Sequence, residues 1–105
     1  MPQYIIAYFG GDKPNSPEEA NQHKSRYRAW LASLGSKAVS PANPLKDTNT
    51  INSDGSITKR SASSMSGFTI IKADAIEEAL SIAKKCPFLD IGGSLEVSEL
   101  MQMSS

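Results

Sequence analysis

The hydrophobic positions of the chain fall into segments with two different spacings. Residues 4–9 are apolar at every position, which is typical of a strand buried on both faces. Beyond residue 16, apolar side chains recur every three or four positions, the spacing of one face of an amphipathic helix. The members of this stripe are Ala20, His23, Tyr27, Trp30, Leu31 and Leu34. We assign Tyr27 and Trp30 to the core rather than to a ligand-binding surface.

The ends of this helix carry local signals of their own. Ser16 is a preferred N-cap, Pro17 suits the first helical position, and Glu19 stands where a capping box needs its acid. Gly35 is a natural C-terminal stop, because glycine readily adopts the conformation that ends a helix. The sequence therefore predicts a helix that begins at Pro17 and ends before Gly35.

The middle of the chain predicts short strands and turns. Residues 37–40 suit a short strand, which Pro41 and Pro44 should break. Residues 50–52 and 56–58 flank a Ser-Asp-Gly turn, so we expect a β-hairpin there.

Two further strands lie on either side of a second helix. Residues 60–66 are rich in serine and predict a mobile loop, and residues 67–72 predict a strand. Residues 94–101 alternate as a final strand, with Leu95 and Val97 on one face.

The second helix is bounded by its own signals. Asp74 is the expected N-cap, and Glu77 is its expected capping partner. Pro87 prevents the helix from continuing far beyond Cys86. The expected buried stripe consists of Ile76, Ala79, Leu80 and Ala83.

The order of these elements is strand–helix–strand, hairpin, strand–helix–strand. It predicts a single α+β domain over residues 1–101, a ferredoxin-like sandwich whose antiparallel sheet carries two helices on one face and an added β-hairpin. The tail, residues 102–105, is expected to fray. Because residues 4–9 are apolar on both faces, the uncovered face of the sheet should also be apolar, which favours a homodimer packed sheet on sheet.

Composition and charge narrow the classes of function. Eleven basic side chains balance eleven acidic ones in 105 residues, so we expect neither nucleic acid nor an anionic membrane as a partner. The longest apolar run is too short to span a bilayer, and the N-terminus lacks the features of a signal peptide. Cys86 and His23, each the only residue of its type, predict no disulfide and no metal site. We therefore expect a cytoplasmic protein with no metal and no cofactor.

Several short stretches resemble the YCII-related family, which includes the DGPF-domain proteins. Over residues 67–87, a glycine, an aromatic residue and a strand lead into an acidic helix that ends in Cys-Pro. Further matches are Trp30-Leu31, Leu34-Gly35, Asp54-Gly55 and the terminal Leu95-Glu96-Val97. The resemblance implies a ferredoxin-like fold of the dimeric α/β-barrel type, in a family most of whose members have no established activity.

The same resemblance points to a histidine–aspartate pair that is suspected of catalysis in some members. His23 stands near the expected histidine, but Cys86 occupies the position of the aspartate before the helix-ending proline. The Asp-Gly-Pro-Phe signature that follows the hairpin is missing from this sequence, and residues 60–66 stand in its place. Both departures weaken the transfer of that catalytic role to this chain.

Three side chains are candidates for acid–base chemistry: His23, Tyr8 and Glu96. An imidazole suits a general base near neutral pH, although a histidine on an apolar stripe is more often a packing residue. Tyr8 can point its hydroxyl into a cleft above the sheet, and either Asp90 or Glu96 can orient the histidine. Cys86, at a helix C-terminus, is expected to pack rather than to react.

The leading interpretation is a small homodimer that binds a small organic molecule. Any chemistry would be cofactor-free proton transfer or hydrolysis, with His23 as the base and Tyr8 or Glu96 as a polar partner. Two alternatives stay open. One is a non-catalytic binding or interaction module, which the Cys86 substitution favours. The other is a dimeric α+β-barrel monooxygenase or isomerase, which rests on analogy of fold alone.

Overall fold

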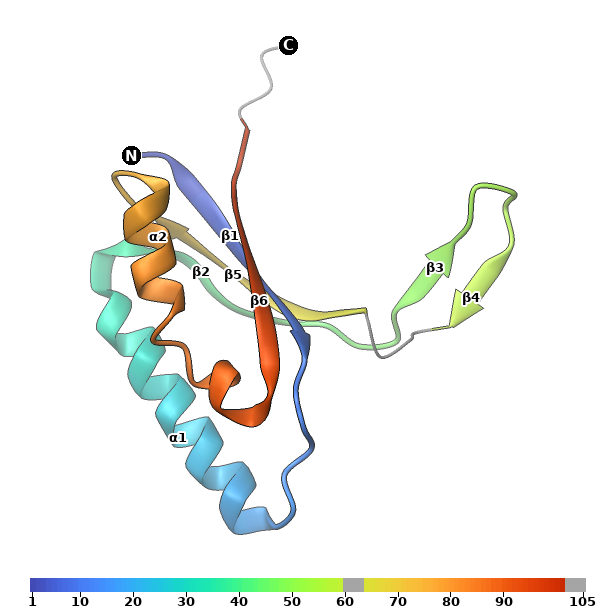
Figure 1. The fold of residues 1–105 in the computed structure, drawn as a ribbon, viewed down its shortest axis with the longest axis horizontal. Helices are drawn as coiled ribbons and strands as arrows, with labels where there is room; N and C mark the ends of the chain where they lie inside the picture. The colour runs from blue at the N-terminus through green and yellow to red at the C-terminus, as the bar shows by residue number, and fades with distance from the viewer. Residues whose placement is uncertain (60–63, 102–105) are drawn as a thin grey trace.

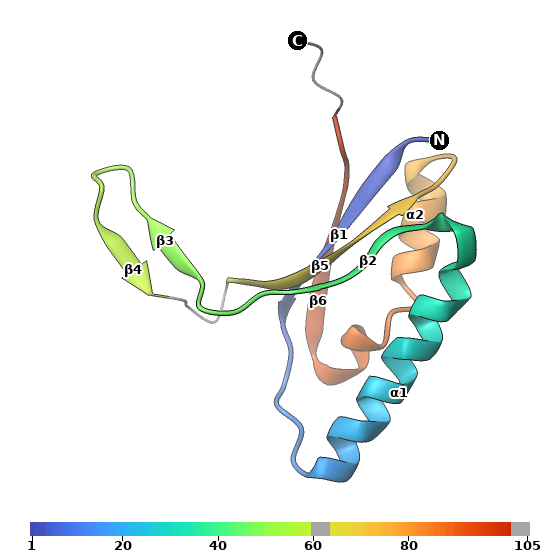
Figure 2. The ribbon, with the colours of Figure 1, turned by 180° about the vertical axis from the view of Figure 1, so that it is seen from behind.

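Figure 1 shows the computed structural model of the protein, which describes residues 1–59 and 64–101. Four strands form one antiparallel sheet in the order β2-β5-β1-β6. These strands are β1 (Gln3–Gly10), β2 (Ala38–Pro44), β5 (Met65–Lys72) and β6 (Gly93–Glu99). Both helices, α1 (Pro17–Leu34) and α2 (Ile76–Ala83), lie on one side of the sheet in Figures 1 and 2. The predicted ferredoxin-like α+β fold is confirmed.

The serine-rich loop predicted at residues 60–66 is described only in part. Met65 and Ser66 belong to β5, and residues 60–63 lie outside the described residues. The tail predicted to fray, residues 102–105, also lies outside them.

The ends of α1 agree with the local signals. The Ser16 hydroxyl accepts a hydrogen bond from the Glu19 N–H at 3.2 Å, and the Glu19 carboxylate accepts one from the Asn15 N–H at 2.9 Å. Gly35 ends the helix with a φ of 55°, in the left-handed region that favours glycine. A short 3₁₀ helix, η1 (Gly35–Lys37), then leads into β2.

The predicted break of the second strand at its prolines is wrong. β2 continues through Pro41 and ends at Pro44. Among the described strands it pairs with β5 alone, and such an edge strand tolerates residues that lack an N–H. Shifts of register between Ala38 and Asn43 accommodate the irregular backbone.

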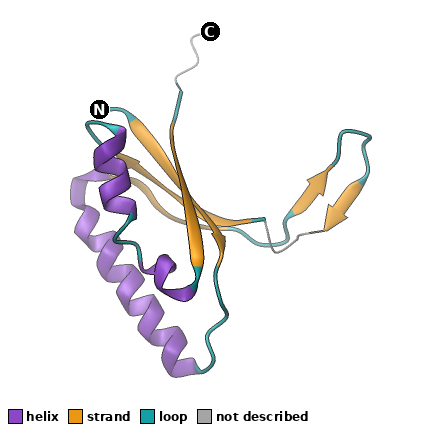
Figure 3. Cartoon of the chain, viewed as in Figure 1, coloured by secondary structure: helices purple, strands orange, loops and turns teal. Residues whose placement is uncertain are grey.

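The predicted β-hairpin is present and stands apart from the main sheet. Its strands, β3 (Asn49–Ile51) and β4 (Ile57–Lys59), pair with each other and project away from the body of the domain (Figure 3). The Asp54 carboxylate closes the turn by accepting hydrogen bonds from the hydroxyl and the N–H of Ser56, at 2.6 and 2.8 Å. These two bonds hold the pKa of Asp54 below its usual range.

The start of α2 differs from the prediction. Its N-cap is Ala75 rather than Asp74, and no side chain of the described residues caps it. Glu78, one position after the expected Glu77, reaches back and accepts the Asp74 N–H at 3.3 Å. The predicted stripe divides into two parts: Ala79 and Ala83 are buried, and Ile76 and Leu80 are exposed.

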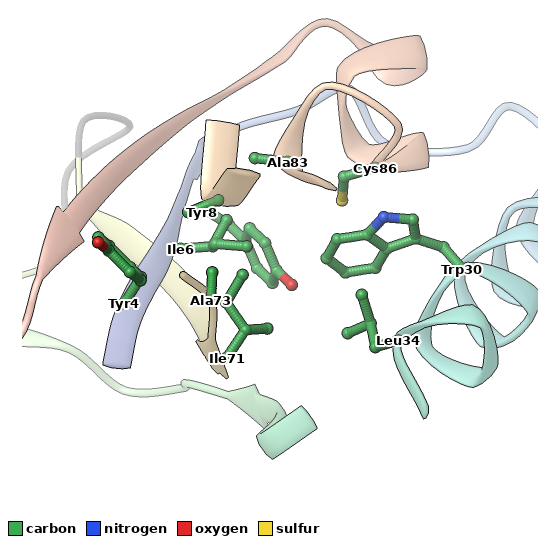
Figure 4. Packing of buried hydrophobic residues seen from close by; sticks show 10 residues of the cluster. Tyr4, Ile6, Tyr8, Trp30, Leu34, Ile71, Ala73, Ala83 and Cys86 are labelled. Carbon is green, nitrogen blue, oxygen red and sulfur yellow. The ribbon is translucent and has the colours of Figure 1, made fainter. Parts of the chain in front are cut away.

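The core lies between the helices and the sheet (Figure 4). At its centre Ile6 of β1 and Ile71 of β5 are fully buried. Trp30 and Leu34 of α1 cover them, and the indole N–H of Trp30 donates to the carbonyl of Ile82 at 3.1 Å. Trp30 is therefore a core residue, as predicted.

The two faces of β1 meet different surroundings. Tyr4, Ile6 and Tyr8 belong to the helix-covered face. Ile5 and Ala7 point to the opposite face, which neither of the described helices α1 and α2 covers. Their cross-strand neighbours on the uncovered face are Ile70 and Phe68 of β5. The uncovered face is therefore apolar along the centre of the sheet, as the sequence predicts.

Candidate functional site

A pocket of about 240 Å³ lies where α1 and the 3₁₀ helix η2 (Pro87–Ile91) approach the end of β2. Its walls combine residues that are far apart in the sequence. The principal lining residues are Tyr8, His23, Tyr27, Asn43, Gly67 and Phe88. Drug-sized ligands occupy pockets of roughly 300–1,000 Å³, so this one suits a smaller molecule.

The ring of Phe88 forms one wall of the pocket and lies against two glycines that leave room for it. It stacks on Tyr8 with ring centroids 5.2 Å apart and an interplanar angle of 30°. A Cβ at Gly93 would lie 2.2 Å from the Phe88 ring, and a Cβ at Gly11 would lie 2.9 Å from it. The absence of a side chain at both positions thus makes room for the aromatic wall.

Tyr8 takes part in a chain of hydroxyl groups beside the pocket. Its Oη lies 2.8 Å from the Oη of Tyr27 and is hydrogen-bonded to the Oγ1 of Thr69. Thr69 is fully buried and donates to the carbonyl oxygen of Pro41 at 2.6 Å. The chain therefore links α1 to β1, β5 and β2 through side-chain hydroxyls.

The surroundings of Tyr8 keep its hydroxyl protonated. Its side chain is 6% exposed, and burial raises the pKa of this phenol far above its ordinary value. Tyr8 is thus suited to donating and accepting hydrogen bonds, and it is unsuited to acting as a base at neutral pH.

His23 lies half-buried on α1, one turn before Tyr27. The two rings are 6.4 Å apart between centroids and nearly parallel, at 19°. His23 lines the pocket and also a neighbouring hollow of about 410 Å³, whose walls include Asp12 and Asp90. The structure thus places His23 and Tyr8 at one pocket, with Asp90 in the adjoining hollow. Within residues 1–59 and 64–101, no ion pair joins His23 to a carboxylate.

Glu96 lies apart from these residues. In the register of β6 it stands opposite Ala7, whereas its neighbour Leu95 stands opposite Tyr8. Its side chain therefore belongs to the uncovered face of the sheet, where it is exposed. The sheet itself separates Glu96 from Tyr8 and His23.

Cys86 behaves as a packing residue. It is 2% exposed and belongs to the core cluster. Burial raises the pKa of its thiol to about 11, so the thiol is protonated at neutral pH. The position at which the family resemblance would place a catalytic aspartate is therefore occupied by an unreactive side chain.

Sequence reasoning missed several residues of the pocket. Tyr27 was expected in the core, but it is half-buried and lines the pocket. Its position four residues after His23 was the available signal, because such residues share a helix face. Thr69 and Phe88 carry no comparable signal, since their neighbours at Tyr8 come from distant parts of the chain.

The part of the chain that the structure describes contains no group of three or more His, Cys, Asp or Glu side chains that could hold a metal ion. None of its described helices is both long and apolar enough to cross a membrane.

Comparison with known proteins places the fold. No family model matches the chain, and no curated protein matches it. A similar solved structure is that of 5-chloro-2-hydroxyhydroquinone dehydrochlorinase (TftG) from Burkholderia phenoliruptrix AC1100, in complex with 2,5-dihydroxybenzoquinone. The likeness covers 96% of this chain and 95% of that chain, with a TM-score of 0.58 and 20% sequence identity. The fold is shared. TftG has the dimeric α+β-barrel type of fold, in agreement with the fold class predicted from the sequence.

Proposed function

We propose that the protein binds a small organic molecule with a single ring in this pocket and acts on it by cofactor-free proton transfer. The observation that carries the proposal is an aromatic wall combined with polar groups around one small hollow. Phe88 and Tyr8 offer ring surfaces, and His23 and Tyr27 bring a nitrogen base and a hydroxyl to the same space. A mainly apolar pocket with a few convergent polar groups is the usual form of a small-molecule site.

The likeness to TftG supports this class of ligand. That protein is named as a dehydrochlorinase of a chlorinated hydroxyhydroquinone, and its structure holds a dihydroxybenzoquinone. For this chain we carry over the class of molecule, a six-membered ring bearing oxygen substituents. Membership of the YCII-related family is part of the same proposal, and it rests on the sequence motifs and on the shared fold.

His23 is the proposed general base. Its ring lines the pocket and also the adjoining hollow, whose walls include Asp90. Tyr8 is the proposed polar partner. It acts through the Tyr27 hydroxyl, to which it is hydrogen-bonded.

A homodimer is part of the proposal because the uncovered face of the sheet is apolar. Ile5, Ala7, Phe68 and Ile70 share that face. Contiguous apolar surface of this kind usually lies in an interface. Glu96, on the same face, then belongs to the dimer interface rather than to the pocket. Light scattering coupled to size exclusion tests this, with the expectation that Phe68→Glu converts the dimer to a monomer.

We also place the protein in the cytoplasm. The support is its cysteine usage, since the sequence holds one cysteine and Cys86 is a free thiol.

The first experiment follows the ring resonances of His23 by NMR, with and without hydroxylated single-ring compounds. Because the chain has one histidine, the signals need no further assignment. We expect the titration midpoint or the chemical shift of His23 to move when such a compound is added. His23→Gln should abolish turnover of any substrate so identified. A ring that never titrates and ignores every compound would refute the proposal.

A non-catalytic binding module is the second candidate. It is favoured by Cys86 in place of a carboxylate and by the lack of an ion pair to His23 among the described residues. This candidate predicts the same ligand response of His23, without chemical change of any ligand over hours.

A further inference from the structure

The hydrogen atoms of the hydroxyl chain beside the pocket all point one way. The carbonyl of Pro41 can only accept, so the hydroxyl of Thr69, 2.6 Å away, donates its one hydrogen to that oxygen. Thr69 must then accept from Tyr8, and Tyr8 must accept from Tyr27 at 2.8 Å. A backbone carbonyl thus fixes the direction of the whole chain. The Tyr27 hydrogen points inward, and a lone pair of its oxygen stays available to the pocket.

Two other polar side chains of the pocket also donate their hydrogens to acceptors of the protein itself. The amide nitrogen of Asn43 has three acceptors for its two hydrogens: the hydroxyl and the carbonyl of Ser40, at 2.9 and 3.0 Å, and the carbonyl of Phe68, at 3.2 Å. The hydroxyl of Ser66 donates to the carbonyl of Tyr8 at 3.2 Å. Asn43 and Ser66 therefore bring no uncommitted hydrogen to the pocket they line.

We propose that Tyr27 acts toward the ligand solely as a hydrogen-bond acceptor, so that the pocket selects rings bearing a hydroxyl donor. The inference rests on the proposed function, because it concerns the ligand of the same pocket. Phenols, catechols and hydroquinones satisfy it. Ethers, carboxylates and quinones without a hydroxyl group would place an acceptor against an acceptor, which leaves both groups without a hydrogen bond. The imidazole N–H of His23 can still donate to an acceptor elsewhere on the ligand. The selection for a hydroxyl donor therefore applies only to the ligand group that lies against Tyr27.

Three probes of nearly equal size test this selection. Phenol can donate and accept, anisole can only accept, and toluene can do neither. In titrations followed by ¹H–¹⁵N NMR, we expect phenol to bind about three- to tenfold more tightly than anisole, the worth of one net hydrogen bond. Toluene should bind at least as well as anisole, because it brings no oxygen lone pair to Tyr27.

Thr69→Val is the decisive variant, because it removes the acceptor that orients Tyr8 while nearly keeping the shape of the side chain. Tyr8 is then free to donate to Tyr27, and Tyr27 can turn its own hydrogen into the pocket. We expect the preference for phenol over anisole to disappear, so that the ratio of the two affinities is about one. Thr69→Ser is the matched control, since it keeps the hydroxyl and should keep the preference.

Tyr27→Phe gives a second route that does not depend on the folding of Thr69→Val. It should also reduce the phenol preference to about onefold, with toluene binding unchanged. Equal binding of phenol and anisole to the wild-type protein, while toluene still binds, would overturn this inference and leave the proposed function standing. A preference that survives in both variants would also overturn it. If none of the three probes shifts any pocket resonance, the proposed function fails, and the inference fails with it.

Discussion

The buried side chains of the helix-covered face form two adjoining groups, which we name the apolar end and the polar end and which meet where Ile6 pairs with Thr69. At one end Ile6 and Ile71 are fully buried among other apolar side chains. At the other end Tyr8 and Thr69 are almost as completely buried, but they are hydrogen-bonded to each other and to a backbone carbonyl. Two positions along β1 separate Ile6 from Tyr8.

The comparison shows two ways in which one small domain accommodates buried side chains. At the apolar end, stability depends on how well the side chains fill the available volume, because apolar packing has no directional requirement. The polar end is stable only while every buried group has its partner, and this requirement fixes which way each hydroxyl faces. The pocket lies beside the polar end, where Tyr8 and Tyr27 line it.

The largest expected effect comes from the apolar end. Ile71→Ala should lower the free energy of unfolding by about 2–5 kcal/mol, because it removes buried methyl groups and leaves a cavity. Urea denaturation measures the loss. Phenol should still bind the folded variant, since Ile71 does not line the pocket. Ile51→Ala, on the projecting hairpin where the side chain is 74% exposed, is the control and should cost clearly less. Equal losses at both positions would contradict the view that the covered face holds the core.

Gly93→Ala should damage the polar end through packing. A Cβ there would lie 2.2 Å from the Phe88 ring, so the ring must leave its stacked position on Tyr8. We expect a loss of about 1–3 kcal/mol in unfolding free energy, together with loss of phenol binding in the NMR titration. Ser94→Ala, at the next and exposed position, should stay within about 0.5 kcal/mol. Unchanged binding in Gly93→Ala would show that Phe88 is not a wall of the site.

The pH dependence of stability should report the burial of Cys86. Its thiol has a pKa raised to about 11 in the folded protein, against an ordinary value of 9.0. The unfolded chain therefore loses this proton first, and stability falls as pH rises from about 9 to about 11. We expect the contribution to reach about 1–2 kcal/mol. Denaturation curves of Cys86→Ala at several pH values should show a shallower fall. An identical slope in the two proteins would mean that the folded thiol is accessible to water.

The smallest effect is expected at the hydroxyl chain itself. Tyr8→Phe keeps the ring that stacks on Phe88 but removes the link between Tyr27 and Thr69. Thr69 still donates to Pro41, and the Tyr27 hydrogen, which loses its acceptor, can turn into the pocket, so the loss in unfolding free energy should be about 1 kcal/mol. Thermal unfolding measures this loss. A loss as large as that of Ile71→Ala would mean that the two ends of the face are not distinct.

The helices and strands could be predicted wherever their signals are local. The N-cap Ser16 and the stop at Gly35 act within one turn of the helix end, so the bounds of α1 follow from neighbouring residues. The prediction failed at Pro41, where the deciding fact was that β2 lies at the edge of the sheet. Edge position depends on which strands pair, and no residue near Pro41 carries that information.

The site was predictable only in part, for the same reason. His23 and Tyr8 were candidates because their side chains have the right chemistry, and the structure places both at one pocket. Tyr27 was assigned to the core because a helical stripe looks alike in sequence whether it faces the core or a pocket.

By itself the sequence determined the order of the elements, the ferredoxin-like fold and the residues with suitable chemistry, because periodicity and capping are properties of neighbouring residues. The tertiary structure alone decided that Thr69, 61 positions from Tyr8, fixes the direction of its hydrogen bond. It also decided that Glu96 stands on the far face of the sheet. Both depend on strand pairing, which joins residues that are distant in the chain and sets the face to which each side chain points.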